Sequence, residues 1–141
     1  MGGGKDYLEK GGFSNYNWEY KGEKIDDIKV IYNSKDQARN SLPTYSNTSE
    51  AYLRKEGNEI AQIRLYKNRK AIIDVDLNPQ KDHRSPNGER VVKGVAHIHE
   101  WYQNKNGEWK RQKFARYLTD KEIKEHGEQL KRYNQKVKFK Q

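Results

Sequence analysis

Two neighbouring stretches of the chain alternate between apolar and polar residues, and this pattern constrains the fold more than any other feature of the sequence. In 59–66 (EIAQIRLY) and 71–77 (AIIDVDL), apolar residues recur at every second position. Because successive side chains of a strand point to opposite faces, each stretch predicts a strand with one apolar and one polar face. The short polar connection at 67–70 predicts that the two strands form an antiparallel hairpin.

The remaining patterns extend this hairpin into a sheet followed by a helix. Further strands are predicted at 15–20, 25–32, 91–102 and 109–117. Thr119 and Glu122 form a capping box, in which each side chain bonds to the other residue's backbone N–H, so a helix is predicted to follow. The sequence therefore predicts an α+β fold with a four- to six-stranded, mostly antiparallel meander, covered by the C-terminal helix.

The segments between these elements are less regular. A turn is expected at 21–24, and Ser34 is expected to cap a short helix that reaches Asn40. Ser49 is expected to cap a second short helix over 50–55, and the alternative is that 33–54 form a mobile loop. The expected organisation is a flexible Gly-rich segment at 1–12, a single domain at 13–137 and a frayed basic tail at 138–141.

Composition restricts the class of protein. Of the 141 residues, 32% are hydrophobic and 35% are charged, which predicts a thin core. The net charge is +9, and residues 101–141 contain twelve basic and five acidic residues, a pattern that favours nucleic acid as partner. The chain has no cysteine, which excludes disulfides and is compatible with a reducing cytoplasm. No apolar run approaches the roughly 20 residues of a membrane span, so no membrane partner is expected.

The polar faces of the predicted strands bring together the residues best suited to chemistry. His97 and His99 are two positions apart and share a face, and Asp74 and Asp76 share the polar face of their strand. If these two strands pair, imidazoles and carboxylates lie together, and Arg64 of the preceding strand joins them. His83 lies in the polar loop at 80–90 and could close over the site.

The sequence contains no phosphate-binding glycine loop, dinucleotide fingerprint or H-E-x-x-H motif, which leaves three interpretations of these residues. In the first, His97 and His99 act as base and acid on RNA while Arg64, Lys110 or Arg111 neutralises the developing charge, without a metal or other cofactor. In the second, the two histidines and a carboxylate bind a divalent metal that activates water. Asp74, Asp76 and His83 are the candidates for supporting residues or further ligands. In the third, histidines and aspartates are cross-strand partners on a solvated face.

Aromatic and basic residues near the histidines are candidates for contact with nucleic acid. They are Tyr66, Trp101, Lys110, Arg111 and Lys113. Aromatic rings stack on bases, and cations bind the phosphate backbone. The alternative for Tyr66 and Trp101 is ordinary packing within the sheet, where both residue types are common.

Three short motifs resemble a family of small proteins encoded by phages and integrative elements of Gram-positive bacteria. The motifs are Ile73-Asp74-Val75-Asp76, His97-Ile98-His99 followed by an aromatic residue, and Leu118-Thr119-Asp120-Lys121-Glu122. The opening Met1-Gly2-Gly3-Gly4 is similar too, and the likeness covers about half of the chain. The chain departs from the family pattern in its longer polar loop before the histidines and in Ala96, where proline is expected.

The resemblance implies a mobile-element protein in the cytoplasm of a bacterial host. Together with the histidines and the basic C-terminal third, it leads to the expectation of a metal-independent endoribonuclease of the toxin type. The alternative expectation is a non-enzymatic binder, such as an anti-CRISPR-like inhibitor or a nucleic-acid-binding accessory, that acts on a nucleoprotein complex.

Overall fold

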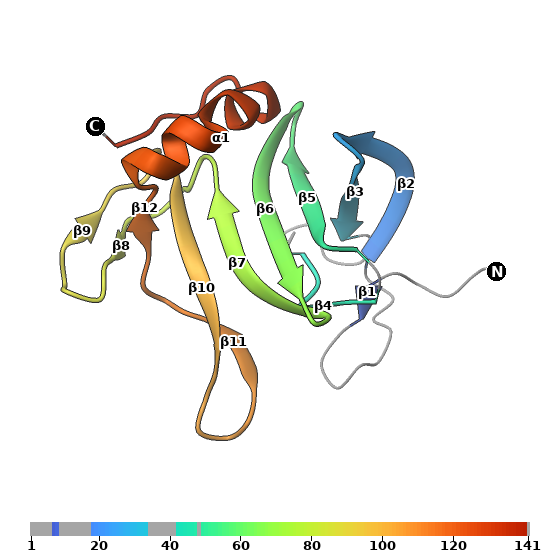
Figure 1. Ribbon diagram of the computed structural model, residues 1–141, viewed down its shortest axis with the longest axis horizontal. Coiled ribbons are helices and arrows are strands. Elements are labelled where there is room, and N and C mark those ends of the chain that lie inside the picture. Colours follow the sequence, from blue (N-terminus) through green and yellow to red (C-terminus); the bar gives the residue numbers. More distant parts are fainter. Residues whose placement is uncertain (1–6, 9–17, 34–41, 48, 141) are drawn as a thin grey trace.

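The computed structural model describes residues 7–8, 18–33, 42–47 and 49–140 (Figure 1). Within these ranges, ten strands form one sheet. They are β1 (Tyr7–Leu8), β2 (Trp18–Ile25), β3 (Ile28–Asn33), β4 (Tyr45–Ser46), β5 (Ala51–Glu56), β6 (Glu59–Lys67), β7 (Lys70–Asp76), β10 (His97–Gln103), β11 (Trp109–Arg111) and β12 (Arg116–Tyr117). β8 (His83–Arg84) and β9 (Arg90–Val91) form a separate hairpin, and helix α1 spans Asp120–Tyr133.

The predicted α+β class, the antiparallel meander and the C-terminal helix are confirmed. The sheet runs in the order β1-β4-β7-β6-β5-β3-β2, and β10 pairs with β7, β11 and β12. It has more strands than the four to six expected, because several strands are only two or three residues long. β3 and β5 pair in parallel, and the other pairs of the sheet are antiparallel.

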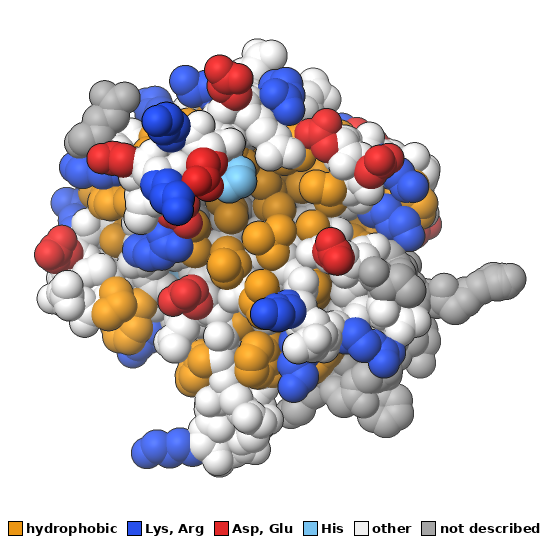
Figure 2. All heavy atoms as spheres, viewed as in Figure 1, with side chains coloured by type: hydrophobic (Ala, Val, Ile, Leu, Met, Phe, Trp, Pro, Cys, Tyr) orange, Lys and Arg blue, Asp and Glu red, His pale blue; other side chains and the backbone are white. Residues whose placement is uncertain are grey.

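Helix α1 covers one end of the apolar face of the sheet (Figure 1). Leu130, Tyr133 and the following Val137 pack against strands β6, β7 and β10 in one core cluster. The strand and loop residues of this cluster are Val30, Leu53, Ile60, Ile63, Leu77, Ala96, Ile98 and Leu118. Because α1 is only 14 residues long, apolar side chains beyond its end stay partly exposed, and Figure 2 shows them gathered in the middle of this face.

Of the turns in the two long hairpins, the sequence predicts one correctly and one incorrectly. The β6–β7 hairpin is confirmed and turns at Asn68 and Arg69, whose φ angles are 52° and 70°. The turn expected at 21–24 is wrong, because β2 continues to Ile25 and the chain turns at Asp26 and Asp27, with φ of 53° and 65°. Two positive φ angles characterise the hairpin turn whose twist matches that of the strands, and aspartate tolerates this conformation better than most residues.

The short helix expected at 50–55 is also wrong. These residues lie in β5, which pairs with β6 on one side and with β3 on the other. Tyr52 and Leu53 are both completely buried, one in each core cluster, so packing on both faces of the sheet overrides the helix-forming residues around them. Gly57, with φ of 60°, belongs to the β5–β6 turn instead of ending a helix.

The ends of the chain differ partly from expectation. The helix expected from Ser34 to Asn40 and most of the Gly-rich segment 1–12 lie outside the described residues, although Tyr7–Leu8 pairs with β4. Fraying was expected at 138–141, but the Lys138 carbonyl accepts a hydrogen bond from the Ala96 N–H (2.8 Å) and Phe139 packs against the core. Among the described residues, no helix is both long and apolar enough to cross a bilayer.

The capping box of α1 is confirmed. Thr119 Oγ1 accepts from the Glu122 N–H at 3.1 Å, and the Glu122 carboxylate accepts from the Thr119 N–H at 2.8 Å. Arg116 donates two hydrogen bonds to the same carboxylate, at 2.8 and 3.1 Å. The bonds from Arg116, aided by Thr119, lower the pKa of Glu122 to about 2 against the opposing effect of burial.

This lowered pKa predicts a pH-dependent contribution to stability. Since the folded pKa lies below the unfolded value of about 4.3, the contribution is complete above about pH 5 and disappears as pH falls toward 2. The difference in unfolding free energy between wild type and Glu122→Gln should therefore be largest near pH 7 and shrink with acidification. Urea denaturation at several pH values measures it, with Glu128→Gln on the exposed side of α1 as control. A difference that does not depend on pH contradicts the prediction.

Candidate functional site

The register of three strands places the predicted polar residues in two rows on the sheet face opposite α1. In the first row, Gln62 of β6 pairs with Asp76 of β7, which pairs with His97 of β10. In the second row, Arg64 pairs with Asp74, which pairs with His99. The prediction that the two histidines and the two aspartates share one face and lie together is confirmed.

The second row contains a buried ion pair. Arg64 donates from Nε to Asp74 Oδ1 at 2.6 Å and from Nη2 to Asp74 Oδ2 at 2.9 Å. Its Nη1 donates to the Leu42 carbonyl, and the Trp101 ring lies against the guanidinium. Arg64 is 5% exposed, so this side chain, expected to act in catalysis, is bound within the protein and supports the strands that carry the histidines.

Asp76 connects the first row to both histidines. Its Oδ1 accepts from Gln62 Nε2 at 2.7 Å, and its Oδ2 lies 3.3 Å from His97 Nε2 and 3.7 Å from His99 Nε2. Asp76 is therefore the carboxylate that faces the imidazoles, whereas both oxygens of Asp74 are taken by Arg64.

His83 completes a set of three imidazoles, which we call the histidine cluster: His83, His97 and His99. It enters from the β8–β9 hairpin, as expected for a loop that closes over the site. Its ring centre lies 4.9 Å from that of His97 and 4.6 Å from that of His99, and the latter two are 5.0 Å apart. One nitrogen from each ring lies within 4.8 Å of the others. Nitrogens of three imidazoles that converge in this way are common metal ligands.

The environment of these groups favours a negative Asp76 and neutral imidazoles at His83 and His99. Burial raises the pKa of Asp76, but contacts with His97, Gln62 and Arg111 outweigh it and lower the pKa to about 2. Burial, aided by the positive charge of Arg111, lowers the pKa of His99 to about 4. Burial also lowers the pKa of His83. A neutral imidazole offers a lone pair, so His83 and His99 are suited to bind a metal.

The residues expected to contact nucleic acid are divided between surface and interior. Lys110, Arg111 and Lys113 are exposed, whereas Tyr66 is buried and its hydroxyl donates to the Pro43 carbonyl. Trp101 is half-buried, with its Nε1 donating to Asp74 Oδ1 at 3.1 Å. Tyr66 and Trp101 therefore pack within the sheet, the alternative considered for them.

Arg111 lies closest to the histidine cluster among these exposed cations. It pairs with Trp101 across the β10–β11 hairpin, and its Nη1 lies 3.5 Å from Asp74 Oδ2 and 3.6 Å from Asp76 Oδ2. Its side chain is 38% exposed, so it connects the buried carboxylates to solvent.

Three contributors to the site were missed by sequence reasoning. Gln62 could have been found, because it has the same strand parity as Arg64 and therefore lies beside Asp76. Gln112, whose carbonyl lies 2.9 Å from His99 Nδ1, follows a strand of only three residues and gives no local signal. Phe114 is 37% exposed beside Lys113, and an isolated phenylalanine does not mark a site in sequence.

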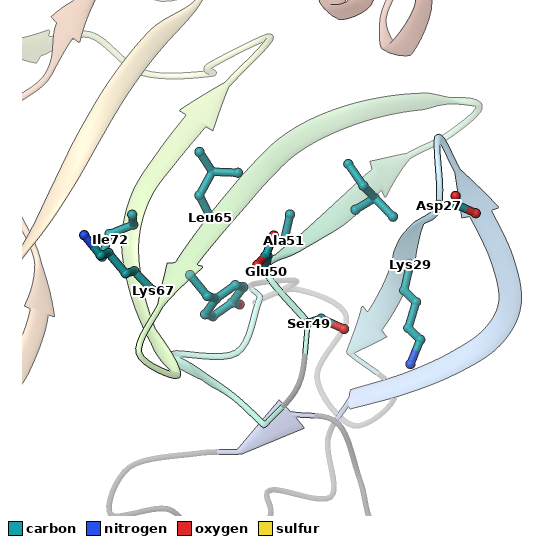
Figure 3. A pocket seen from close by; sticks show the side chains of 10 residues that line it. Asp27, Lys29, Ser49, Glu50, Ala51, Leu65, Lys67 and Ile72 are labelled. Atoms are coloured by element: carbon teal, nitrogen blue, oxygen red, sulfur yellow. The ribbon is translucent and has the colours of Figure 1, made fainter.

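The apolar face of the sheet contains a hollow that is a second candidate for a binding site. Asp27 and Lys29 line one side, Leu65, Lys67 and Ile72 line the other, and residues 49–51 lie between them (Figure 3). The hollow is lined by charged residues of both signs. The three histidines, which are the residues able to bind a metal, lie on the opposite face of the sheet. The histidine cluster is therefore the stronger candidate.

Comparison of the chain with protein-family models, with curated proteins and with solved structures finds no match. The geometry of the histidine cluster and its surroundings is therefore the main indication of function.

The buried ion pair leads to a stability prediction. Arg64→Met should lower the unfolding free energy by about 3–5 kcal/mol, because it leaves the Asp74 carboxylate buried without its partner. The double variant Arg64→Met/Asp74→Leu should recover part of this loss, since no charge remains unpaired. The control is Arg54→Met on β5, which removes a partly exposed ion pair with Glu56 and should cost less than about 1 kcal/mol. Equal losses for the two single variants, measured by urea denaturation, would contradict a dominant role for the buried pair.

Proposed function

We propose that this protein binds RNA through the surface around the β10–β11 hairpin and cleaves it at the histidine cluster. The observation that carries the proposal is the position of Arg111. This exposed cation lies within 3.6 Å of Asp76, the carboxylate that contacts His97 and His99. A phosphate bound by Arg111 would therefore lie beside the groups able to promote its cleavage.

The charge and surface of the chain support an RNA partner. The net charge is +9, and Lys110 and Lys113 are exposed on the same segment as Arg111. Tyr102 and Phe114 are the two large hydrophobic side chains that stay exposed among the described residues. Tyr102 lies on β10, and Phe114 lies just after β11. Exposed aromatic rings beside cations are typical of proteins that stack single-stranded bases. Lys110 pairs with Tyr102 on the face opposite Arg111, so an RNA strand would contact both faces of the hairpin.

The burial of the histidines restricts the mechanism. Direct acid–base catalysis requires ring nitrogens that reach the 2′-hydroxyl and the leaving oxygen of the substrate. His97 and His99 are both completely buried. The proposal therefore assigns cleavage to the histidine cluster as a unit, and the metal-independent mechanism expected from the sequence is less well supported by this geometry.

The same burial favours a second candidate function, RNA binding without cleavage. In that case the histidines hold the fold together and the exposed residues of the hairpin bind the partner. This is the class of the alternative expectation, a nucleic-acid-binding accessory or an inhibitor of a nucleoprotein complex. The mobile-element setting suggested by the resemblance would suit either function, and a ribonuclease toxin should arrest bacterial growth when expressed.

Binding to single-stranded RNA tests the role of Arg111. Arg111→Ala should weaken binding and reduce the slope of log affinity against log salt by about 0.7, the contribution of one phosphate contact on a single strand. Lys124→Ala, which removes an exposed cation from α1, is the matched control and should leave the slope unchanged. An unchanged slope for Arg111→Ala means that this residue does not contact phosphate.

Cleavage is measured on the same RNA with purified protein. We expect cleavage by wild type, a loss with His83→Ala and a strong decrease with Arg111→Ala. RNA that is bound but stays intact would replace the proposed function by the binding function. RNA that is neither bound nor cleaved would overturn both.

A further inference from the structure

The histidine cluster contains an unusual concentration of buried polar atoms without hydrogen-bond partners. Across the described residues, five buried side-chain nitrogens lack such a partner, and four belong to the cluster: Nδ1 of His83, both ring nitrogens of His97 and Nε2 of His99. A buried polar atom without a partner is unfavourable, and in native proteins such an atom usually has a compensating interaction, such as ordered water or a bound ion. Because each of the three rings contributes at least one such nitrogen, they indicate that the site has a ligand.

We propose that His83, His97, His99 and Asp76 bind a single zinc ion. As a binding site, the proposal depends on geometry alone. As the source of the cleavage chemistry, it depends on the proposed function. Three imidazoles and one carboxylate form a donor set that zinc accepts in tetrahedral coordination, whereas magnesium and calcium require mainly oxygen ligands.

The distances agree with tetrahedral coordination. Zinc–nitrogen bonds of 2.0–2.1 Å place neighbouring donor atoms about 3.3–3.4 Å apart. Asp76 Oδ2 lies 3.3 Å from His97 Nε2 and 3.7 Å from His99 Nε2. The three ring centres form a nearly equilateral triangle with sides of 4.6 to 5.0 Å. The separations between donor nitrogens, which reach 4.8 Å at most, would have to shorten when the metal binds.

Hydrogen bonds around the cluster orient the donor atoms toward the centre. His99 Nδ1 lies 2.9 Å from the Gln112 carbonyl oxygen and donates to it, which leaves the Nε2 lone pair free. Gln62 Nε2 donates to Asp76 Oδ1 at 2.7 Å and turns Oδ2 toward the histidines. Partners of this kind fix the tautomer and orientation of metal ligands in known sites.

Packing between the rings is the alternative explanation. The three rings meet edge to face, with interplanar angles of 78° to 82°, a favourable arrangement for aromatic side chains. Phenylalanine would provide the same contacts without burying unpaired nitrogens, so packing alone does not explain the choice of histidine at three positions from two separate sheets.

Zinc would also explain how buried histidines can serve an RNA-cleaving enzyme. With two positive charges from zinc, Arg64 and Arg111 as cations, and Asp74 and Asp76 as anions, the site has a net charge of about +2 and attracts phosphate. If water displaces Asp76, zinc lowers the pKa of that water to about 7. The resulting hydroxide accepts the 2′-hydroxyl proton as the 2′ oxygen attacks phosphorus. The water so formed then returns the proton to the departing 5′ oxygen.

Metal binding is tested directly on the full chain. The protein is stripped of metals with a chelator and dialysed against Zn²⁺ alone, and bound metal is then counted by elemental analysis. We expect one zinc per chain and a higher melting temperature than that of the stripped protein. Co²⁺ in place of Zn²⁺ should give the absorption bands of a tetrahedral site. Substoichiometric uptake with no change in melting temperature would overturn the proposal.

Variants establish which residues bind the metal. His83→Ala is the principal variant, because His97 and His99 are completely buried and their replacement threatens folding. It should weaken zinc binding by more than the roughly 10–100-fold that loss of a supporting partner costs, whereas Gln62→Ala should fall within that range. His126→Ala, which removes an exposed histidine from α1, is the matched control and should bind zinc as wild type does. Wild-type affinity in His83→Ala would overturn the assignment.

The experiments distinguish a failure of the zinc site from a failure of the proposed RNA cleavage. Stoichiometric zinc without RNA cleavage supports the metal site and removes the proposed enzyme activity. RNA cleavage that persists in zinc-free protein overturns the zinc mechanism and restores the metal-independent one.

Discussion

The Asp74 carboxylate connects three strands at one buried point, and the polar half of the protein depends on it. It accepts from Arg64 on β6 and from Trp101 on β10, while Asp74 itself belongs to β7. Because side chains alternate along a strand, a shift of one residue would move every group of this face to the apolar side. The ion pair is too deeply buried to tolerate such a shift, since both charges would lose their partners. The register thus specifies which carboxylate faces the histidines.

The apolar and polar faces of the sheet are covered by different means. On the apolar face, α1 packs through a continuous hydrophobic cluster. On the opposite face, the β8–β9 hairpin reaches the sheet by way of His83, with Val91 as its buried apolar residue. The hairpin is also held by hydrogen bonds from the Ala115 N–H to the Arg84 carbonyl and from the Val92 N–H to the Tyr117 hydroxyl, and a shared ligand among the three histidines would add to them. Such a ligand would explain why polar residues, which usually lie at surfaces, are buried here.

Much of the fold and part of the site could be predicted from the sequence. The β6–β7 hairpin and the capped helix follow from local patterns, and the shared face of His97 and His99 follows from their spacing. The turn at Asp26 and the strand at 51–56 could not be predicted, because tertiary pairing decides between alternatives that are locally similar. The burial of His97 and His99 and the position of His83 against them depend on contacts between segments distant in sequence. For that reason an exposed catalytic pair was a reasonable expectation, and the enclosed cluster was not foreseen.

The hydrogen bond between the Lys138 carbonyl and the Ala96 N–H has a consequence for biosynthesis. Ala96 directly precedes the strand that carries His97 and His99, so the final fixing of that strand waits for a segment made about 40 residues later. At a translation rate of roughly 5–20 residues per second, the interval lasts about 2–8 s. During this time the N–H of Ala96, next to His97, lacks the partner that it has in the folded chain. The edge of the site is therefore completed by one of the last segments of the chain to be made.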